Sequence, residues 1–293
     1  MTDDAQPAAG THREPLGLIA GQGRLPMLVS AGAHAQGRRV CAVGLAGQFD
    51  PGLPVLCDEF REVGLFRIGS WARRLRRMGV RQAVMVGRVD KSQLMHSRLR
   101  LLHSAPDLRT LSLWYRHLRH DRRSAAVLTA VCDELGRLGV TLIDSTQPIP
   151  EHLASIGVMT RREPSAMELA DIEFAWPLFQ DLLTLGVGQS LAVRERDIVA
   201  VEAVEGTDRM IQRAGECCPR GGWTLCKGAS ADHDRRADVP TVGESTIRNA
   251  HAAGCRCIAL AAGDVILVDR PETLALADEL GIAVVGRPAD SKN

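Results

Sequence analysis

The sequence predicts an α/β protein with two domains, the first built on a parallel sheet and the second on a mixed sheet. In the first half, short apolar runs alternate with segments that carry apolar residues at helical spacing, which is typical of βαβ units. A proline-marked segment, STQPIPEH, interrupts this alternation near residue 150. Beyond it a hairpin pattern precedes the next strands and helices, so a mixed sheet is expected there.

Each predicted helix of the first domain, residues 15–150, carries a local signal. Pro26 suits the first turn of the first helix, Ser70 is a candidate cap of the second, and Gly139 closes the third. Residues 1–14 are polar and are expected to form a disordered lead-in. The predicted strands and helices alternate in the order strand 16–20, helix 25–37, strand 40–46, helix 68–78, strand 80–87, helix 124–138 and strand 140–144.

The second domain, residues 151–293, is predicted to open with a helix. Ser165 and Glu168 form a capping-box pattern ahead of a stretch that ends near Gly186. The run SLAVRERDIVAVEAVEG predicts a hairpin that turns at Glu195–Asp197. Further strands are expected in WTLCKG, CRCIALAAG, VILVD and GIAVVG, with helices at 244–253 and from Pro271 onward.

Composition argues against several classes of protein. No apolar run reaches the roughly 18 residues that a membrane-spanning helix needs, and the N-terminus lacks the order of a signal peptide, so we expect a cytoplasmic protein. The formal net charge is +1 and aromatic residues make up 3% of the chain. Both values argue against a nucleic-acid partner.

The charge is unevenly distributed along the chain. Residues 61–123 carry 16 basic and 4 acidic side chains, whereas residues 151–293 carry 15 basic and 22 acidic ones. The basic stretch is expected to face an anionic substrate or the inner leaflet of a membrane, with a solvated arginine surface as the alternative.

The first strand runs into the glycine-rich turn Gly21-Gln22-Gly23-Arg24-Leu25-Pro26. Glycines allow a close backbone approach to a ligand, and the following helix N-terminus favours an anion. A dinucleotide site would require a third glycine at Pro26 and an acidic residue after the second strand, so NAD binding is rejected. A looser nucleotide or phosphate site and a tight packing turn remain as alternatives.

The second half contains a cluster of acids with an interleaved arginine. Asp234, Arg236 and Asp238 alternate at period two, so an extended segment would place them on one face. Carboxylates there could hold a divalent cation while the arginine grips a phosphate, a combination that suits pyrophosphate hydrolysis. A solvated loop with self-paired charges is the alternative. Upstream, Glu205 and Asp208 are further candidates for a metal shell, and Asp208 also suits a helix N-terminus.

Taken together, LGLIAGQGRLP, VMVGRV, VEAVEGTDRM and DRRADVPTVG occur in an order and at separations that resemble the LpxI-type UDP-2,3-diacylglucosamine pyrophosphatases of lipid A biosynthesis. The resemblance covers residues 16–286. It implies a Rossmann-like first domain and a distinctive second domain. It also implies Mg²⁺-dependent (alternatively Mn²⁺-dependent) hydrolysis of UDP-2,3-diacylglucosamine to UMP and lipid X, attack by water on the sugar-side phosphorus, a glycolipid partner and a homodimer.

The resemblance also assigns roles to single residues. It places Asp234, Arg236, Asp238 and Lys227 in the catalytic group. From the positions of these motifs we predict that Asp234 and Asp238 bind the metal or orient the attacking water, and that Glu205 or Asp208 completes the metal shell. The predicted substrate-binding residues are Gly21, Gly23, Leu25, Pro26, Gly206 and Thr207.

Two departures from the family pattern keep the substrate open. Where members read lysine-proline-x-glutamine, this chain has Ser230-Ala231-Asp232-His233, and the middle residue of the glycine turn is Gln22. Serine cannot replace the charge of lysine, and histidine offers other hydrogen bonds than glutamine. The alternatives are therefore a related nucleotide-sugar pyrophosphatase with another substrate and a catalytically silent member that binds a glycolipid or nucleotide. His233 itself is interpreted as a ligand or base, or as an exposed, inert loop residue.

Overall fold

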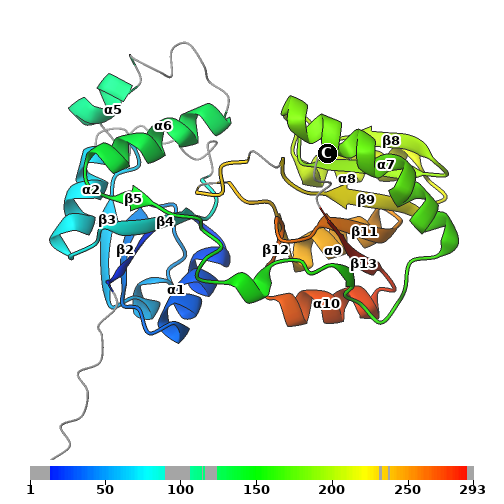
Figure 1. Ribbon diagram of the computed structural model, residues 1–293, viewed down its shortest axis with the longest axis horizontal. Helices are drawn as coiled ribbons and strands as arrows, with labels where there is room; N and C mark the ends of the chain where they lie inside the picture. Colours follow the sequence, from blue (N-terminus) through cyan, green and yellow to red (C-terminus); the bar gives the residue numbers. More distant parts are fainter. Residues whose placement is uncertain are drawn as a thin grey trace, which may run out of the picture. The chain divides into compact units, whose positions relative to one another are not determined.

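The computed structural model describes residues 14–89, 106–113, 115, 124–230, 233–236 and 238–288. The chain divides into two compact units, residues 1–148 and 149–293, and the division falls inside STQPIPEH. Each unit has its own sheet and its own buried core, so the predicted α/β class is confirmed (Figure 1). Outside the described residues lie the lead-in at 1–13, the parts of the basic stretch at 90–105 and 116–123, and the departures Ala231 and Asp232.

The first unit contains a five-stranded parallel sheet in the order β3-β2-β1-β4-β5. β1 and β2 are buried along their whole length, as continuous apolar runs require when helices cover both faces of a sheet. The strand order reverses between β1 and β4, and the edge beyond such a point is where ligands bind in doubly wound folds. The strands are β1 Leu16–Ala20, β2 Val40–Leu45, β3 Glu59–Val63, β4 Gln82–Val86 and β5 Thr141–Leu142.

The described helices of this unit are α1 (Leu25–Ala35), α2 (Ile68–Arg77), α5 (Leu108–Leu113) and α6 (Ser124–Arg137), with a 3-10 turn η1 at Pro54–Leu56. All three predicted helices are present, and α5 is an addition.

The expected cap of α2 at Ser70 is wrong, because Ser70 lies inside the helix. Asp107 and Thr110 accept the first backbone N–H groups of α2 instead, from Gly69 at 2.8 Å and from Ile68 at 3.3 Å. Because these acceptors lie about 40 residues away in the sequence, local pattern could not reveal them.

β3 was missed by the sequence analysis because its residues, EFREV, are mostly charged. It is an edge strand, and only its last residue, Val63, is fully buried. Asp58 joins its start to β2. The backbone N–H of Asp58 donates to the Val40 carbonyl at 2.9 Å, and the Val40 N–H donates to the Asp58 carboxylate at 2.7 Å. Pairing with a buried neighbour therefore overrides the weak strand propensity of this segment.

The second unit contains a six-stranded mixed sheet in the order β6-β13-β11-β9-β7-β8, as predicted. β9, β11 and β13 run parallel, and β6 and β7 pair with them antiparallel. The predicted VILVD strand is reduced to β12 (Ile266–Leu267), which pairs with β10 (Thr241–Val242) in a separate small sheet. The strands of the large sheet are β6 Gly157–Val158, β7 Ser190–Arg194, β8 Asp197–Val201, β9 Trp223–Lys227, β11 Cys255–Ala261 and β13 Ala283–Arg287.

Local sequence signals determine the turns of this unit. The β7–β8 hairpin turns at Glu195 and Arg196, which have φ values of 52° and 60°. Positive φ at both central residues is typical of the type I′ turn, whose twist matches that of the flanking strands. The capping box of α7 (Ala166–Leu185) forms as predicted. The Glu168 N–H donates to the Ser165 hydroxyl at 3.3 Å, and the Ser165 N–H donates to the Glu168 carboxylate at 2.7 Å.

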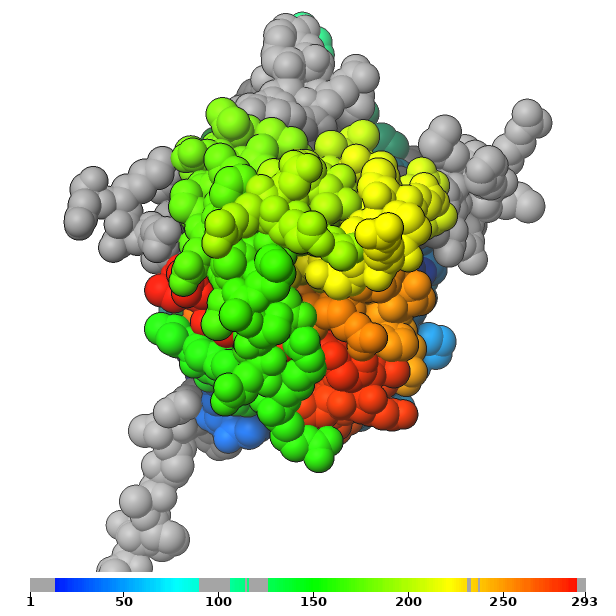
Figure 2. All heavy atoms as spheres, turned by 90° about the vertical axis from the view of Figure 1, so that its right-hand side faces the viewer, coloured from blue at the N-terminus to red at the C-terminus, as the bar shows by residue number. Residues whose placement is uncertain are grey.

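Helices cover both faces of the large sheet. α7 packs on β7 and β9, while α8 (Thr207–Cys217), α9 (Glu244–Ala252) and α10 (Arg270–Glu279) form a row on the other face. A short 3-10 turn, η3 (Pro150–His152), opens the unit. Figure 2 shows α7 in green on one side and the yellow-to-orange residues on the other. The core between these layers includes Trp176, Phe179 and Trp223. Among the described residues, no helix meets the length and apolarity needed to span a membrane.

The link between Asp58 and β2 predicts a pH dependence of stability. The Val40 N–H and the His34 ring hold the pKa of the Asp58 carboxyl below its usual range. A lowered pKa in the folded state stabilises the protein above the unfolded pKa of about 4, and this stabilisation is lost as the pH falls through the folded pKa. We expect Asp58→Asn to be less stable than wild type at pH 6, with the difference shrinking below about pH 4. Urea denaturation at several pH values would measure this, and parallel stability curves would contradict it.

Candidate active site

Gly21 occupies a point where two chain segments touch. Its N–H donates to the Val86 carbonyl at 2.9 Å, and Gln22 and Arg88 exchange backbone hydrogen bonds of 2.8 and 2.9 Å. A Cβ on Gly21 would lie 2.7 Å from the backbone of Gly87. Of the two interpretations of this turn, the tight packing turn is therefore the one that explains Gly21.

The rest of the turn leaves space for a ligand. Gly23 is exposed at φ +102°, with no heavy atom within 4 Å of the position a Cβ would take. Leu25 begins α1 half-buried, and the buried Pro26 lies in its first turn as predicted. No side chain caps this helix end, which lies beside the reversal point of the strand order. This combination of an uncapped helix N-terminus and an open glycine suits an anionic group.

A buried hydrogen-bonded chain links charges in the second unit. The Lys227 ammonium donates to the Thr207 hydroxyl at 2.6 Å, and that hydroxyl donates to the Glu202 carboxylate at 2.9 Å. Lys227 is 5% exposed and Glu202 is 8% exposed. Because a buried charge is costly without a partner, the hydroxyl between them stabilises both.

The secondary structure brings this chain together from four places. Lys227 is the last residue of β9, and Ser190 lies opposite it at the start of the antiparallel β7. The Ser190 hydroxyl lies 3.3 Å from that of Thr207. Glu202 follows β8, and Thr207 is the first residue of α8, after a turn at Gly206 with φ 82°. The chain therefore lies where β9 ends and α8 begins.

The predicted extended face of Asp234, Arg236 and Asp238 is not formed. The backbone turns at Arg235 and Arg236, and the Arg236 N–H donates to the Asp234 carboxylate at 3.1 Å. The Arg236 guanidinium also grips this carboxylate, with Nε 2.8 Å from Oδ1 and Nη2 2.7 Å from Oδ2. Such local side-chain bonds compete with extended backbone. Asp234 and Arg236 are therefore paired with each other.

Asp238 interacts electrostatically with the buried chain. The surface of this residue is exposed, but the surrounding protein partly desolvates the carboxyl group and raises its pKa. His233 and Lys227 oppose this rise, and Glu202 adds to it. His233 is half-buried, and its Nε2 atom is buried without a hydrogen-bond partner among the described residues. The interpretation of His233 as an exposed loop residue is therefore wrong.

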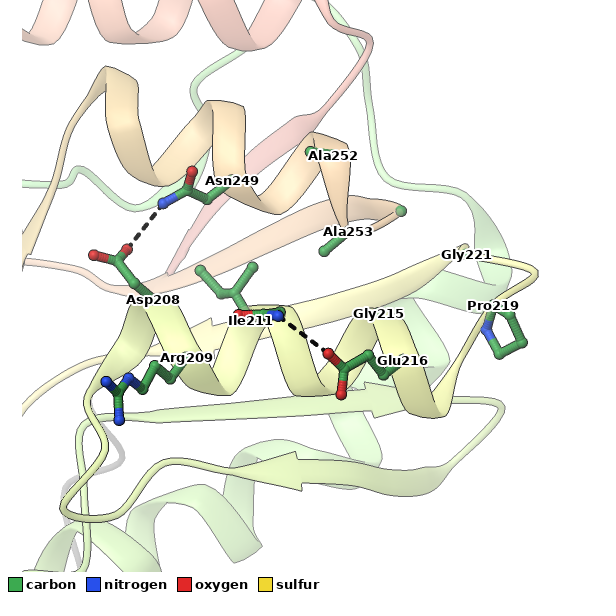
Figure 3. A pocket seen from close by; sticks show the side chains of 12 residues that line it. Asp208, Arg209, Ile211, Gly215, Glu216, Pro219, Gly221, Asn249, Ala252 and Ala253 are labelled. Atoms are coloured by element: carbon green, nitrogen blue, oxygen red, sulfur yellow. Dashed lines mark hydrogen bonds between the residues drawn. The ribbon is translucent and has the colours of Figure 1, made fainter.

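Glu205 and Asp208 have partners of their own. The Glu205 carboxylate lies 2.6 Å from the Arg213 guanidinium, and its pKa is lowered by hydrogen bonds from backbone N–H groups and by this arginine. Asp208 accepts a hydrogen bond from the Asn249 amide at 3.1 Å (Figure 3). It lines a groove of about 650 Å³ between α8 and α9, together with residues such as Gly215 and Ala253.

The predicted metal ligands suit only a cation that is coordinated by few protein side chains. Among the described residues, no point gathers three or more histidine, cysteine, aspartate or glutamate side chains in the manner of a metal site. Asp234, Glu205 and Asp208 have separate partners, so a shell of all four acids is not assembled. Mg²⁺ commonly binds through one or two carboxylates, with waters and substrate phosphates supplying the rest, and Asp238, whose residue surface is exposed, fits that mode.

Two members of the buried chain were missed in the sequence. Glu202 lies in VEAVEG, where the second acid, Glu205, was chosen because a glycine turn follows it. An acid directly after an apolar strand was a usable signal for Glu202. Ser190 offered none, because its role comes from pairing with Lys227 across the sheet.

Comparison with known proteins covers both units. The LpxI N-terminal domain family matches residues 15–152, and the LpxI C-terminal domain family matches residues 155–285. A curated relative from Caulobacter vibrioides, named UDP-2,3-diacylglucosamine pyrophosphatase LpxI, is 31% identical over an alignment of 284 residues that covers 92% of this chain and 96% of the relative.

The two glycines of the first turn should respond differently to substitution. Gly21→Ala is expected to lower the free energy of unfolding of the first unit by about 1–3 kcal/mol, because its Cβ would meet backbone that cannot yield. Gly23→Ala introduces no steric clash and is strained only by the positive φ. It should lower the free energy of unfolding by about 1–2 kcal/mol, without shifting β1 against β4. Amide hydrogen exchange at Gln22 and Arg88 would separate the two. Equal protection in both variants would contradict the packing role of Gly21.

The hydroxyl of Thr207 should be needed to keep Lys227 and Glu202 buried. Thr207→Val removes it at nearly constant volume and is expected to cost about 1–3 kcal/mol of unfolding free energy, since both charges lose a partner. Thr207→Ser retains the hydroxyl and is the matched control. Urea denaturation followed by tryptophan fluorescence would measure both, and a valine variant as stable as the serine variant would refute the arrangement.

Proposed function

The chain belongs to the LpxI family, and from this premise we propose that it hydrolyses the pyrophosphate of UDP-2,3-diacylglucosamine to UMP and 2,3-diacylglucosamine 1-phosphate. The name of the Caulobacter relative supports this substrate. The observation that carries the proposal is the buried Lys227 at the end of β9, beside the N-terminus of α8 and followed by the loop of Asp234, Arg236 and Asp238. An ammonium group held in this position suits the binding of a pyrophosphate.

Lys227 and the start of α8 would bind the phosphates. Lysine offers N–H donors in several directions, and its hydrogen bond to Thr207 fixes where the ammonium points. α8 begins at Thr207 after Gly206, and no side chain caps it, so its backbone N–H groups can add to the positive field. Gly206 and Thr207 thus fit the substrate-binding role that the family implies.

Arg236 and the two aspartates would act on the reacting group. Without substrate, Arg236 and Asp234 neutralise each other. A phosphate oxygen pair can replace the carboxylate in the guanidinium fork, which frees Asp234. Asp234 and Asp238 are then the two groups that can orient the attacking water. The water oxygen bonds to the sugar-side phosphorus, and the bond to the bridging oxygen breaks to release UMP. Mg²⁺ or Mn²⁺, when bound, would neutralise charge on the pyrophosphate.

A second candidate function follows from His233 and Ser230. These residues stand where the family pattern has glutamine and lysine, and His233 is within electrostatic range of Asp238. A different set of donors at this point favours a related nucleotide-sugar pyrophosphatase with another head group or acyl pattern. A catalytically silent member would bind UMP or lipid X without metal-dependent turnover. A panel of acylated and non-acylated UDP-sugars would separate these alternatives.

The place of action follows from the proposed substrate. A glycolipid with two acyl chains resides in a membrane, so we infer that the protein meets it at the cytoplasmic face of the inner membrane. We also propose that the protein forms the homodimer that the family implies.

The aspartates should be essential for turnover. Asp234→Asn and Asp238→Asn are each expected to lower kcat about 10²–10⁴-fold, the range for loss of a group that orients or deprotonates the nucleophile. Asp181→Asn, on the exposed surface of α7, is the control. The assay is UMP release from synthetic UDP-2,3-diacylglucosamine in detergent, with and without Mg²⁺.

Hydrolysis in ¹⁸O-labelled water should place the label in the lipid phosphate. Label in UMP would contradict attack at the sugar-side phosphorus. Near-wild-type turnover of both aspartate variants would refute their roles, and no UMP release under any condition would refute the function.

A further inference from the structure

The outer face of α2 carries several exposed arginines. Arg73, Arg74, Arg76 and Arg77 are all exposed, and within the described part of the chain none of them forms an ion pair. Among the described residues, the guanidinium groups of these four arginines form one hydrogen bond, from Arg76 to the Leu138 carbonyl at 3.5 Å. Residues 67–77, 106–113 and 126–137 together contain seven arginines and three acids. The positive charge of this face is therefore available to an external partner.

Two of the three acids near this face, Asp107 and Glu134, have partners inside the first unit. Glu134 lies 3.5 Å from Arg109 and 3.3 Å from Arg137. Asp107 accepts hydrogen bonds from the N-terminal turn of α2 and from Thr110. Arg73, Arg76, Arg77 and Arg109 line a groove of about 450 Å³ whose floor includes Ala72 and Leu138. A groove of this size with several guanidinium groups suits phosphate head groups.

Apolar side chains project beside the arginines. Leu108 is 85% exposed, Leu111 is 49% exposed and Tyr115 is 67% exposed. They lie on or next to α5, which packs on α2 through the hydrogen bonds of Asp107 and Thr110. Exposed leucines and a tyrosine next to a basic groove match the composition of surfaces that enter the interface of an anionic membrane.

We propose that this α2–α5 face docks on an anionic lipid bilayer, with the arginines on the head groups and the α5 leucines in the interface. A nucleic acid would match the charge but would leave Leu108 and Leu111 without a use. The proposal rests on the proposed function only for the reason why the protein visits a membrane. Its test uses vesicles without substrate, so its failure and that of the hydrolase assignment are distinguishable.

The experiment measures sedimentation of the full-length protein with vesicles of phosphatidylcholine, alone or with 30% phosphatidylglycerol, at low and at high salt. We expect binding to the anionic vesicles that weakens with salt. Arg73→Gln with Arg77→Gln should reduce the partition coefficient about 25-fold, since each basic residue near an anionic surface contributes roughly fivefold. Leu108→Ser with Leu111→Ser should also reduce binding, and this loss should persist at high salt.

Arg220→Gln with Arg248→Gln removes the same charge from the exposed surface of the second unit and is the matched control. Thermal unfolding and UMP release in detergent check that each variant is folded. Equal binding to neutral and anionic vesicles would overturn the proposal. So would equal losses in test and control pairs, displacement by millimolar glycerol phosphate, or unchanged binding of the leucine variant. Preference for RNA over vesicles would assign the face to nucleic acid.

Discussion

A lysine buried at the end of a strand constrains the architecture of the second unit. The Thr207 hydroxyl joins the Lys227 ammonium to the buried Glu202 carboxylate and so helps to keep both charges inside the protein. This link holds the end of β9 to the beginning of α8 and to the residue after β8, since a buried charge without a partner costs several kcal/mol. The loop that carries Asp238 then follows β9 into the same electrostatic environment.

The first unit rests on a steric constraint of a different kind. Its strand order reverses between β1 and β4, and beyond this point Gly21 and Gly87 approach too closely for a side chain on either. This contact closes the first part of the glycine-rich turn and leaves Gly23 and the N-terminus of α1 open. One short motif therefore serves two purposes, packing at its first glycine and access to the helix end at its second.

Pairing of charges distinguishes the two ends of the acidic motif. Asp234 is paired with Arg236 within its own turn, whereas the pKa of Asp238 responds to His233, Lys227 and Glu202. A phosphate that binds Arg236 would therefore change the electrostatic environment of Asp234 more than that of Asp238. The basic face of α2 follows the opposite pattern, because its arginines form no ion pair with an acid of the described residues and are exposed at the surface.

The sequence by itself determined the fold class, most strands and helices and the residues of the family motifs, because these depend on periodicity and on short-range signals such as the capping box at Ser165. Only the tertiary structure decided the charged edge strand β3, the cap of α2 by Asp107, and the partners of the motif residues. Thr207 and Lys227 are 20 residues apart. Contacts of this kind depend on which strands become neighbours, and the local sequence pattern does not predict strand order.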